Sequence, residues 1–207
     1  MVAIHKKLMK ILKDPIIIWL FFASKFQKLL FLRKVKRDGE IYFKYKGDLF
    51  PGYLNTGNAA QNIRQKALEY CRGYGLDIGA GSWALDGAVA IDNNPDQNAL
   101  KLDRFGNGSL DYIFSSHCLE HLSKWREGLK LWINKLKPEG ILFLYLPHVA
   151  QKLWRPGGPW VGHAHRWSPT VEVVAKFLED NGMAIIEASR GMDRYYSFHI
   201  VAKKRKL

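Results

Sequence analysis

Residues 75–81 read Gly-Leu-Asp-Ile-Gly-Ala-Gly, a short apolar segment that runs into a glycine-rich turn. Such a pattern is typical of the first strand of a parallel α/β sheet, with the turn at the carboxyl end of the strand. Gly79 and Gly81 allow a ligand to approach the backbone closely because glycine has no side chain. Because a Gly-x-Gly turn alone is a weak indicator, the segments around it decide its meaning.

Alternating helices and strands are expected from residue 58 onward. The predicted strands are 75–78, 88–92, 98–103, 111–115, 141–146, 183–189 and 197–202, and the predicted helices are 58–71, 125–136 and 169–181. This succession predicts an α/β fold with a doubly wound, mostly parallel, seven-stranded sheet. Ligands bind such a sheet beyond the carboxyl ends of its strands.

Acidic residues end three of the predicted strands, at Asp77, Asp92 and Asp103. Carboxylates suit a cationic amino group, ribose hydroxyls and an adenine amine, whereas they repel phosphates. The third glycine of a dinucleotide-binding turn is also missing, since the chain has Trp83-Ala84 there. The acids therefore favour a cationic nucleoside ligand over a dinucleotide.

Four segments in order, 75–82, 90–95, 109–122 and 136–148, resemble the motifs of class I S-adenosylmethionine (SAM) dependent methyltransferases, and the last two are similar to the type 11 branch. The resemblance covers about residues 70–203 and implies a Rossmann-like methyltransferase fold, methyl transfer as the activity and SAM as the cofactor. The cofactor-binding residues that it implies are Asp77, Gly79, Ala80, Gly81, Asp92, Asn93, Asp103, Arg104 and Ser116.

The connection after the glycine turn is unusually short. Only fifteen positions separate Asp77 from Asp92, so we expect the usual helix between these strands to be largely absent and residues 82–87 to form a turn. Compact versions of this kind resemble methyltransferases of sugar and surface-polysaccharide biosynthesis.

Several histidines fall near the predicted carboxyl edge of the sheet. A general base is useful when the methyl acceptor is a hydroxyl, and histidine is the natural candidate. The candidates, in order of preference, are His117, His148 and His165, with Glu120 as an alternative. His163-Ala164-His165 has no cysteine or acid close by in the sequence, so we expect no metal ion.

The segment 151–168 is the predicted acceptor-binding loop, because a connection of this length usually has a function. Indole faces suit sugar rings, and arginines bind phosphate or carboxylate groups. The expected substrate-binding residues are Trp154, Arg155, Trp160, His163, Arg166 and Trp167. The alternative is that the tryptophans only pack the loop against the protein.

The positive charge of the chain is concentrated at its N-terminus. Of the net charge of +13, residues 1–46 contribute +9, from 12 Lys/Arg and three acids. We expect two regions: residues 1–46, a basic and apolar helix followed by a hairpin, and residues 47–207, the methyltransferase domain. The apolar run 15–23 is short for a membrane span, so the helix is expected to bind an anionic membrane surface or, alternatively, to pack on protein. The modest charge of the remaining residues argues against a nucleic-acid partner.

These patterns leave more than one function open. The preferred hypothesis is O-methylation of a saccharide, a glycolipid or a related cell-surface precursor at the membrane face. Methylation of a lipophilic small molecule such as a quinone precursor is an alternative, and an inactive SAM-binding module held to a membrane or a partner is another. With only Cys71 and Cys118, a disulfide framework is not expected. The predicted location is the cytoplasm, with peripheral attachment to the inner face of the cell membrane.

Overall fold

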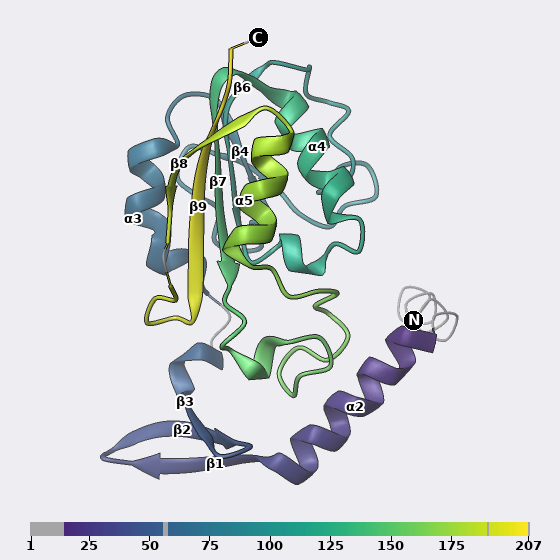
Figure 1. Cartoon of the computed structure of the whole chain (residues 1–207), viewed down its shortest axis with the longest axis vertical. Helices are drawn as coiled ribbons and strands as arrows, with labels where there is room; N and C mark the ends of the chain where they lie inside the picture. The colour runs from purple at the N-terminus through teal and green to yellow at the C-terminus, as the bar shows by residue number, and fades with distance from the viewer. Residues whose placement is uncertain (1–14, 56–57, 190, 207) are drawn as a thin grey trace. The chain divides into compact units, whose positions relative to one another are not determined.

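The computed structural model describes residues 15–55, 58–189 and 191–206. The chain divides into two compact units, and the first 14 residues of the predicted N-terminal region lie outside the described residues (Figure 1). Unit 1 consists of residues 1–57 and 151–168, and unit 2 consists of residues 58–150 and 169–207. The predicted acceptor loop therefore belongs to the same unit as the N-terminal helix.

Unit 1 contains a helix and a small antiparallel sheet with the strand order β1-β2-β3. Its elements are α2 (Pro15–Phe31), β1 (Leu32–Arg37), β2 (Glu40–Tyr45), β3 (Asp48–Pro51) and the short 3-10 helices η1 (Gly52–Asn55) and η3 (Lys152–Trp154). The predicted hairpin is thus a three-stranded meander. Among the described residues, no helix has the length and apolar content needed to cross a membrane.

Unit 2 is a mixed sheet of six strands in the order β5-β4-β6-β7-β9-β8. Its strands are β4 (Gly75–Ile78), β5 (Val89–Ile91), β6 (Leu110–Ser116), β7 (Leu136–Pro147), β8 (Met183–Ala188) and β9 (Ser197–Lys204), and its helices are α3 (Ala60–Tyr70), η2 (Leu119–His121), α4 (Trp125–Lys135) and α5 (Val171–Asp180). The pairs β4–β5, β4–β6 and β6–β7 are parallel, whereas β9 runs antiparallel to β7 and β8. The predicted α/β fold with a mostly parallel sheet is confirmed.

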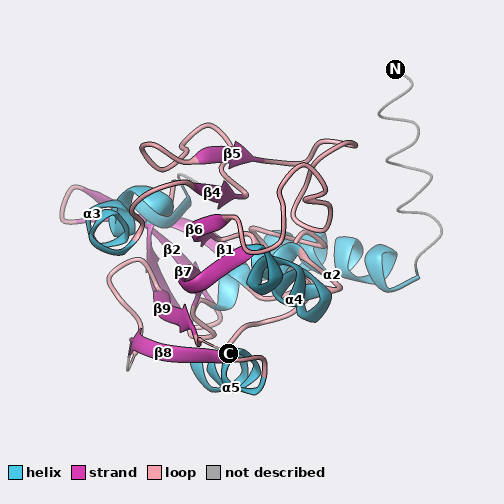
Figure 2. Ribbon diagram, turned by 90° about the horizontal axis from the view of Figure 1, so that it is seen from above, coloured by secondary structure: helices cyan, strands magenta, loops and turns pink. Residues whose placement is uncertain are grey.

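Helices cover both faces of this sheet. Figures 1 and 2 show α3 on one face and α4 and α5 on the other. On the α3 side, alternate residues of the central strands meet the helix, including Tyr112 and Phe114 of β6 and Phe143 and Tyr145 of β7. Both faces of β6 and of residues 141–146 of β7 are largely buried, which explains the nearly continuous apolar sequence of these segments. The residues that end β4 and β6 therefore extend from the buried centre of the sheet.

Two predictions about the connections have different outcomes. The expected shortening after the glycine turn is confirmed, because residues 79–88 contain no helix and join β4 directly to β5. The predicted strand 98–103 was wrong: the segment forms a tight turn closed by an isolated bridge between Asn98 and Lys101, so the sheet has six strands instead of seven. Asn98 explains the error, because its side-chain oxygen accepts a hydrogen bond from the backbone N–H of Leu100 and favours a turn over a strand.

Candidate functional site

The glycine turn after β4 is held by one buried carboxylate. Asp77 is 2% exposed, and its Oδ2 accepts a hydrogen bond from the backbone N–H of Leu85 at 2.8 Å. Burial raises the pKa of Asp77 to about 6, although the hydrogen bond from Leu85 and the positive charge of Arg64 oppose this rise. Asp77 thus ties the end of β4 to the short connection that replaces a helix.

The two outer glycines of the turn have different surroundings. Gly79 has a φ of +84°, and a Cβ atom there would lie 2.5 Å from the Cβ of Cys118, so the packing of the protein itself excludes a side chain. Gly81 has a φ of +52°, but a Cβ atom there would meet nothing within 4 Å. The space beside Gly81 is therefore open to a ligand.

The neighbouring strands add polar groups at the same edge of the sheet. Asp92 directly follows β5, its side chain is exposed, and its Oδ1 accepts the backbone N–H of Asn93 at 2.7 Å. Ser116 ends β6 and is 9% exposed, and its Oγ has no hydrogen-bond partner within the described part of the chain. Because β4 lies between β5 and β6, these groups flank the glycine turn. An open glycine, an exposed carboxylate and an unsatisfied hydroxyl fit the methionine and ribose parts of SAM.

Asp103 and Arg104 lie on the loop that follows the turn 98–101, and both are exposed. Arg104 donates a hydrogen bond from Nη1 to Oε1 of Gln97 at 3.1 Å. Their predicted role toward the adenine ring stays a prediction, since they are placed by a loop and not by the end of a strand.

His117 follows β6 with a left-handed backbone, φ +48°, which is uncommon for a residue with a side chain. Its Nε2 lies 2.9 Å from Oγ of Ser197, and that hydroxyl donates its proton to the carbonyl oxygen of Tyr195 at 3.1 Å. The tautomer compatible with that donation has the proton on Nε2, which donates to Ser197. In the neutral ring this assignment leaves the lone pair on Nδ1, which lies 3.7 Å from Oε1 of Glu120.

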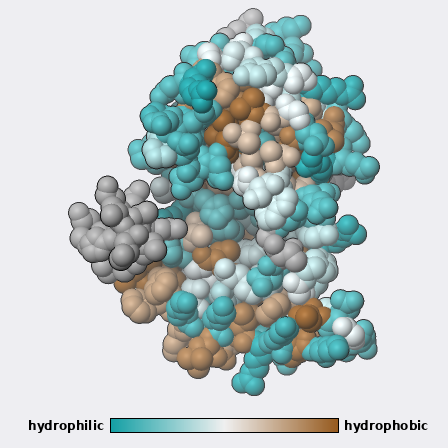
Figure 3. All heavy atoms as spheres, turned by 180° about the vertical axis from the view of Figure 1, so that it is seen from behind, coloured by the Kyte–Doolittle hydropathy of each residue, from teal (hydrophilic) through white to brown (hydrophobic). Residues whose placement is uncertain are grey.

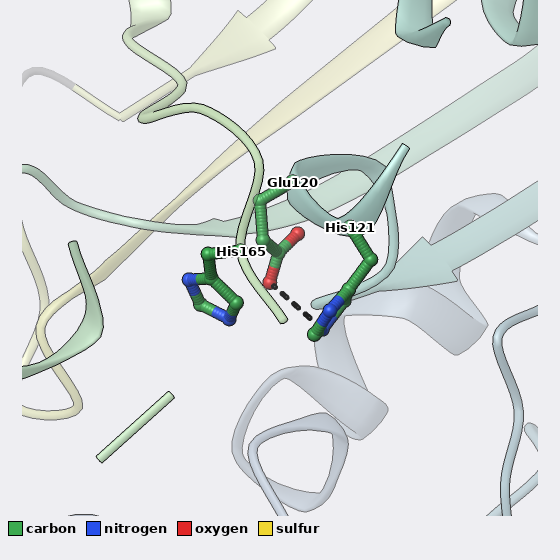
Figure 4. Close-up of side chains that lie close together, drawn as sticks. All are labelled: Glu120, His121 and His165. Atoms are coloured by element: carbon green, nitrogen blue, oxygen red, sulfur yellow. Dashed lines mark ion pairs between the residues drawn. The ribbon is translucent and has the colours of Figure 1, made fainter. Parts of the chain in front are cut away.

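Glu120 is a fully buried acid between two histidines. Burial raises its pKa to about 8. Figure 4 shows Glu120 with His121, whose Nε2 lies 4.0 Å from Oε1 of Glu120. The side chain of His121 is 41% exposed, whereas that of His117 is 17% exposed. His117 is therefore the more enclosed of the two.

His148 follows the end of β7, and in its ring Nδ1 instead of Nε2 is held by a hydrogen bond. Its Nδ1 accepts a hydrogen bond from the backbone N–H of Ala150 at 3.1 Å, so the neutral ring carries its proton on Nε2. The ring lines a cavity of about 530 Å³ together with Thr170, Glu172 and Ser189. In this arrangement the outward nitrogen of His148 is a hydrogen-bond donor, which disfavours it as a general base.

The predicted acceptor loop packs within unit 1. The ring of Trp160 lies 5.1 Å from that of Phe43 and 6.4 Å from that of Trp154, measured between centroids. The ring of His163 lies 6.2 Å from that of Phe21. Trp160 therefore has the packing role that the sequence left as an alternative.

The remaining predicted residues of this loop differ in exposure. Arg155 is exposed, Arg166 and Trp167 are partly buried, and His165 is 5% exposed. Arg155 and Arg166 thus present the more accessible charges of the loop, whereas His165 is enclosed.

Sequence reasoning missed Ser197 and Tyr195, which orient His117. They lie at and just before the start of β9, and antiparallel pairing of Ser197 with Pro147 brings them to the carboxyl edge of the parallel strands. No local motif marks these residues, because their position depends on the reversal of β9 relative to β7.

Comparisons with known proteins agree with this geometry. A family described as "Methyltransferase domain" matches residues 55–188. None of the curated proteins compared with the sequence matches it.

Several solved structures share the fold. A SAM-dependent methyltransferase from Mesorhizobium loti is 15% identical with a TM-score of 0.56, over 72% of this chain and 100% of that chain. A SAM-dependent methyltransferase from Methanosarcina mazei is 18% identical with a TM-score of 0.52, over 69% of this chain and 98% of that chain. The [4+2]-cyclase SpnF is 15% identical with a TM-score of 0.52, over 71% of this chain and 82% of that chain.

At these identities the structural likeness shows the fold, and the family match shows the class of enzyme. The family match and the methyltransferase relatives support the prediction of SAM as the methyl donor. The chain belongs to the methyltransferase domain family and is a methyltransferase.

Proposed function

We propose that this methyltransferase transfers the methyl group of SAM to a hydroxyl group of a saccharide or glycolipid at the cytoplasmic face of a membrane. The observation that carries the acceptor side of this proposal is the composition of unit 1. It joins the apolar, basic helix α2 and the Trp- and Arg-containing loop 151–168 in one compact unit.

The cofactor side of the proposal rests on the carboxyl ends of β4, β5 and β6. Bound SAM supplies a methyl group that its positively charged sulfur makes reactive. The open space at Gly81 admits the methionine moiety, and the carboxylate of Asp92 accepts hydrogen bonds from ribose hydroxyls. Ser116 Oγ offers an unused hydrogen-bonding group near the reacting atoms. These residues mainly bind and align, and alignment provides much of the rate enhancement of such a displacement.

His117 is the proposed general base. Nδ1 of His117 would take the proton of the acceptor hydroxyl as that oxygen becomes methylated. The hydrogen bond from Nε2 to Ser197 holds the ring in the tautomer that this step requires. Glu120 lies 3.7 Å from the same Nδ1, and its carboxylate, which becomes the major form above a pH of about 8, stabilises the imidazolium that is produced. A general base of this kind contributes about 10²–10⁴-fold to the rate.

The same helix also suits a lipophilic acceptor such as a quinone precursor, so the two acceptor classes must be separated by experiment. Purified protein and SAM with a labelled methyl group are incubated with glycolipid, water-soluble saccharide and apolar lipid fractions. We expect label in a saccharide-containing fraction, at a product stable to mild base, as a methyl ether is and a methyl ester is not. Label only in the apolar fraction, or only in base-labile products, would contradict the proposed acceptor.

The proposed base has its own test in the same assay. His117→Gln keeps a side chain of similar size and hydrogen-bonding ability but cannot take the proton. We expect a rate loss of about 10²-fold or more with an unchanged affinity for S-adenosylhomocysteine. His148→Gln is the matched control and should retain most of the rate, because its outward nitrogen is a donor.

A further inference from the structure

Helix α2 has apolar side chains on two sides. On one side Ile17 and Leu20 are buried. On the other side, residues at helical spacing form what we call the exposed stripe: Trp19, Phe22, Phe26, Leu29 and Leu30. Trp19 is 68% exposed and Leu29 is 83% exposed, and Figure 3 shows hydrophobic atoms gathered over this helix. Large apolar side chains that cluster in this way mark an interaction surface.

The buried side of α2 is occupied by the predicted acceptor loop of the same unit. Ser24 Oγ donates a hydrogen bond to the carbonyl oxygen of Gly158 at 2.9 Å, and Gln27 Nε2 donates to that of Gly157 at 3.0 Å. A Cβ atom at Gly157 would lie 3.1 Å from Cδ2 of Leu20. Because protein covers this side, lipid cannot surround the helix, and only its exposed stripe is available to an apolar environment.

The charge next to the exposed stripe is positive. Residues 15–46 hold eight Lys/Arg and two acids, Asp38 and Glu40, which gives a net charge of +6. The exposed basic residues of α2 and β1 are Lys25, Lys28, Arg33, Lys34, Lys36 and Arg37. A second copy of the chain would bring the same positive charge to this surface, whereas an anionic bilayer has the opposite charge and an apolar interior.

We infer that the exposed stripe inserts into the interfacial region of an anionic lipid bilayer, with the axis of α2 in the membrane plane. A helix of 17 residues with one side bound to protein, and with Lys25 and Lys28 in its C-terminal half, suits this orientation. Because α2 binds the loop 151–168 on its other side, the docked helix holds that loop at the lipid surface. The inference rests on the proposed function in one respect: it names bilayer lipid as the carrier of the acceptor.

Vesicle sedimentation tests the docking surface without any methyl acceptor. The full-length protein should pellet with vesicles that contain about one third phosphatidylglycerol and much less with phosphatidylcholine alone. The double variant Trp19→Ser, Phe22→Ser should bind the anionic vesicles at least about tenfold more weakly, because it removes two apolar anchors. The matched control is Val173→Ser, Ile186→Ser, which changes two side chains of unit 2 that are 45% and 46% exposed. The control should bind as the unchanged protein does.

A conservative variant tests the depth of insertion. Lipids with brominated acyl chains quench tryptophan fluorescence only where an indole reaches the acyl region. Such vesicles should quench a fraction of the emission of the unchanged protein, and Trp19→Phe should lose that quenched fraction while still binding. Binding with no loss of quenching in Trp19→Phe would contradict the predicted orientation.

Three further results would overturn the inference. These are equal binding to neutral and anionic vesicles, equal binding by the double variant and the unchanged protein, and a concentration-dependent dimer in light scattering that the double variant abolishes. The last result would assign the stripe to a second copy of the chain. Methyl transfer to a water-soluble saccharide is measured separately, so a failure of docking and a failure of the proposed reaction give different results.

Discussion

Two glycine-containing segments of this chain are held in place by different means. The turn 79–81 is fixed by residues nearby in the sequence, since Asp77 binds the backbone N–H of Leu85 and Gly79 binds the carbonyl oxygen of Ile91. The segment 157–162 has local turn hydrogen bonds, such as that from Gly157 N–H to the carbonyl oxygen of Gly162, and is also bound by Ser24, which lies more than 130 residues away. The proposed cofactor side of the protein thus depends mainly on hydrogen bonds between neighbouring segments, and the predicted acceptor side adds a long-range contact with the N-terminal helix.

This difference has a physical consequence. A local turn forms with the sheet that contains it, so changes there affect the stability of unit 2 and the binding of the cofactor together. The loop 151–168 is joined to α2 by hydrogen bonds from Ser24 and Gln27, so changes to those two side chains should alter the loop without affecting the sheet. Substitutions at Gly79, Asp77 and Ser24 test this separation, in order from the largest expected effect to the smallest.

Gly79→Ala should lower the free energy of unfolding by about 4 kcal/mol, from overpacking against Cys118 and from the strain of an alanine at φ +84°. Gly81→Ala is the matched control, because its Cβ meets no atom within 4 Å, and should cost only about 1 kcal/mol of backbone strain. Urea unfolding monitored by circular dichroism measures both. Equal losses in the two variants would show that the packing of Gly79 on Cys118 is not what requires glycine.

Asp77→Asn should raise the free energy of unfolding at neutral pH by about 2 kcal/mol, while it weakens cofactor binding. The pKa of Asp77 is raised from 3.8 to about 6, so between these pH values the folded protein keeps a proton that the unfolded chain has lost. The stability due to Asp77 therefore falls as the pH rises through this range, and asparagine avoids that fall.

The difference between Asp77→Asn and the unchanged protein should thus be small near pH 4 and complete by about pH 7. Urea unfolding at several pH values, without cofactor, checks the profile. A variant that is less stable at every pH would contradict the assigned burial cost of the carboxylate.

Ser24→Ala should reduce the free energy that stabilises the contact between α2 and the loop by about 1 kcal/mol, because it removes the donor to the carbonyl oxygen of Gly158. Amide hydrogen exchange within 151–168 should become about fivefold faster, with no change in β4 or β6. Ser123→Ala, at an exposed serine of unit 2, is the control. Faster exchange throughout the sheet would show that the two regions are not independent.

The sequence predicted those regions of the molecule that local pattern determines. The strand and turn at 75–81, the short connection after it and the buried strands β6 and β7 all follow from residues close together in the chain. The strand expected at 98–103 failed because the hydrogen bond from the backbone N–H of Leu100 to the side-chain oxygen of Asn98 outweighed the apolar alternation.

Contacts between residues far apart in the sequence could not be predicted from local sequence patterns. Nothing in residues 15–31 indicates that Ser24 and Gln27 bind the backbone of Gly157 and Gly158. Likewise, Ser197 reaches His117 only because β9 reverses direction beside β7. The segments proposed to bind the cofactor could therefore be named from the sequence, whereas the partners of the proposed base could not.

The central claim is that the carboxyl ends of β4 and β5 bind SAM, and calorimetry with S-adenosylhomocysteine tests it most directly. The unchanged protein should bind this product, and Asp92→Ala should lose at least about tenfold in affinity because two ribose hydrogen bonds to a carboxylate are removed. Asp96→Ala, at another exposed acid that follows β5, should bind normally. Absence of binding to the unchanged protein, or an equal loss in both variants, would contradict the assignment of this edge of the sheet as the SAM site.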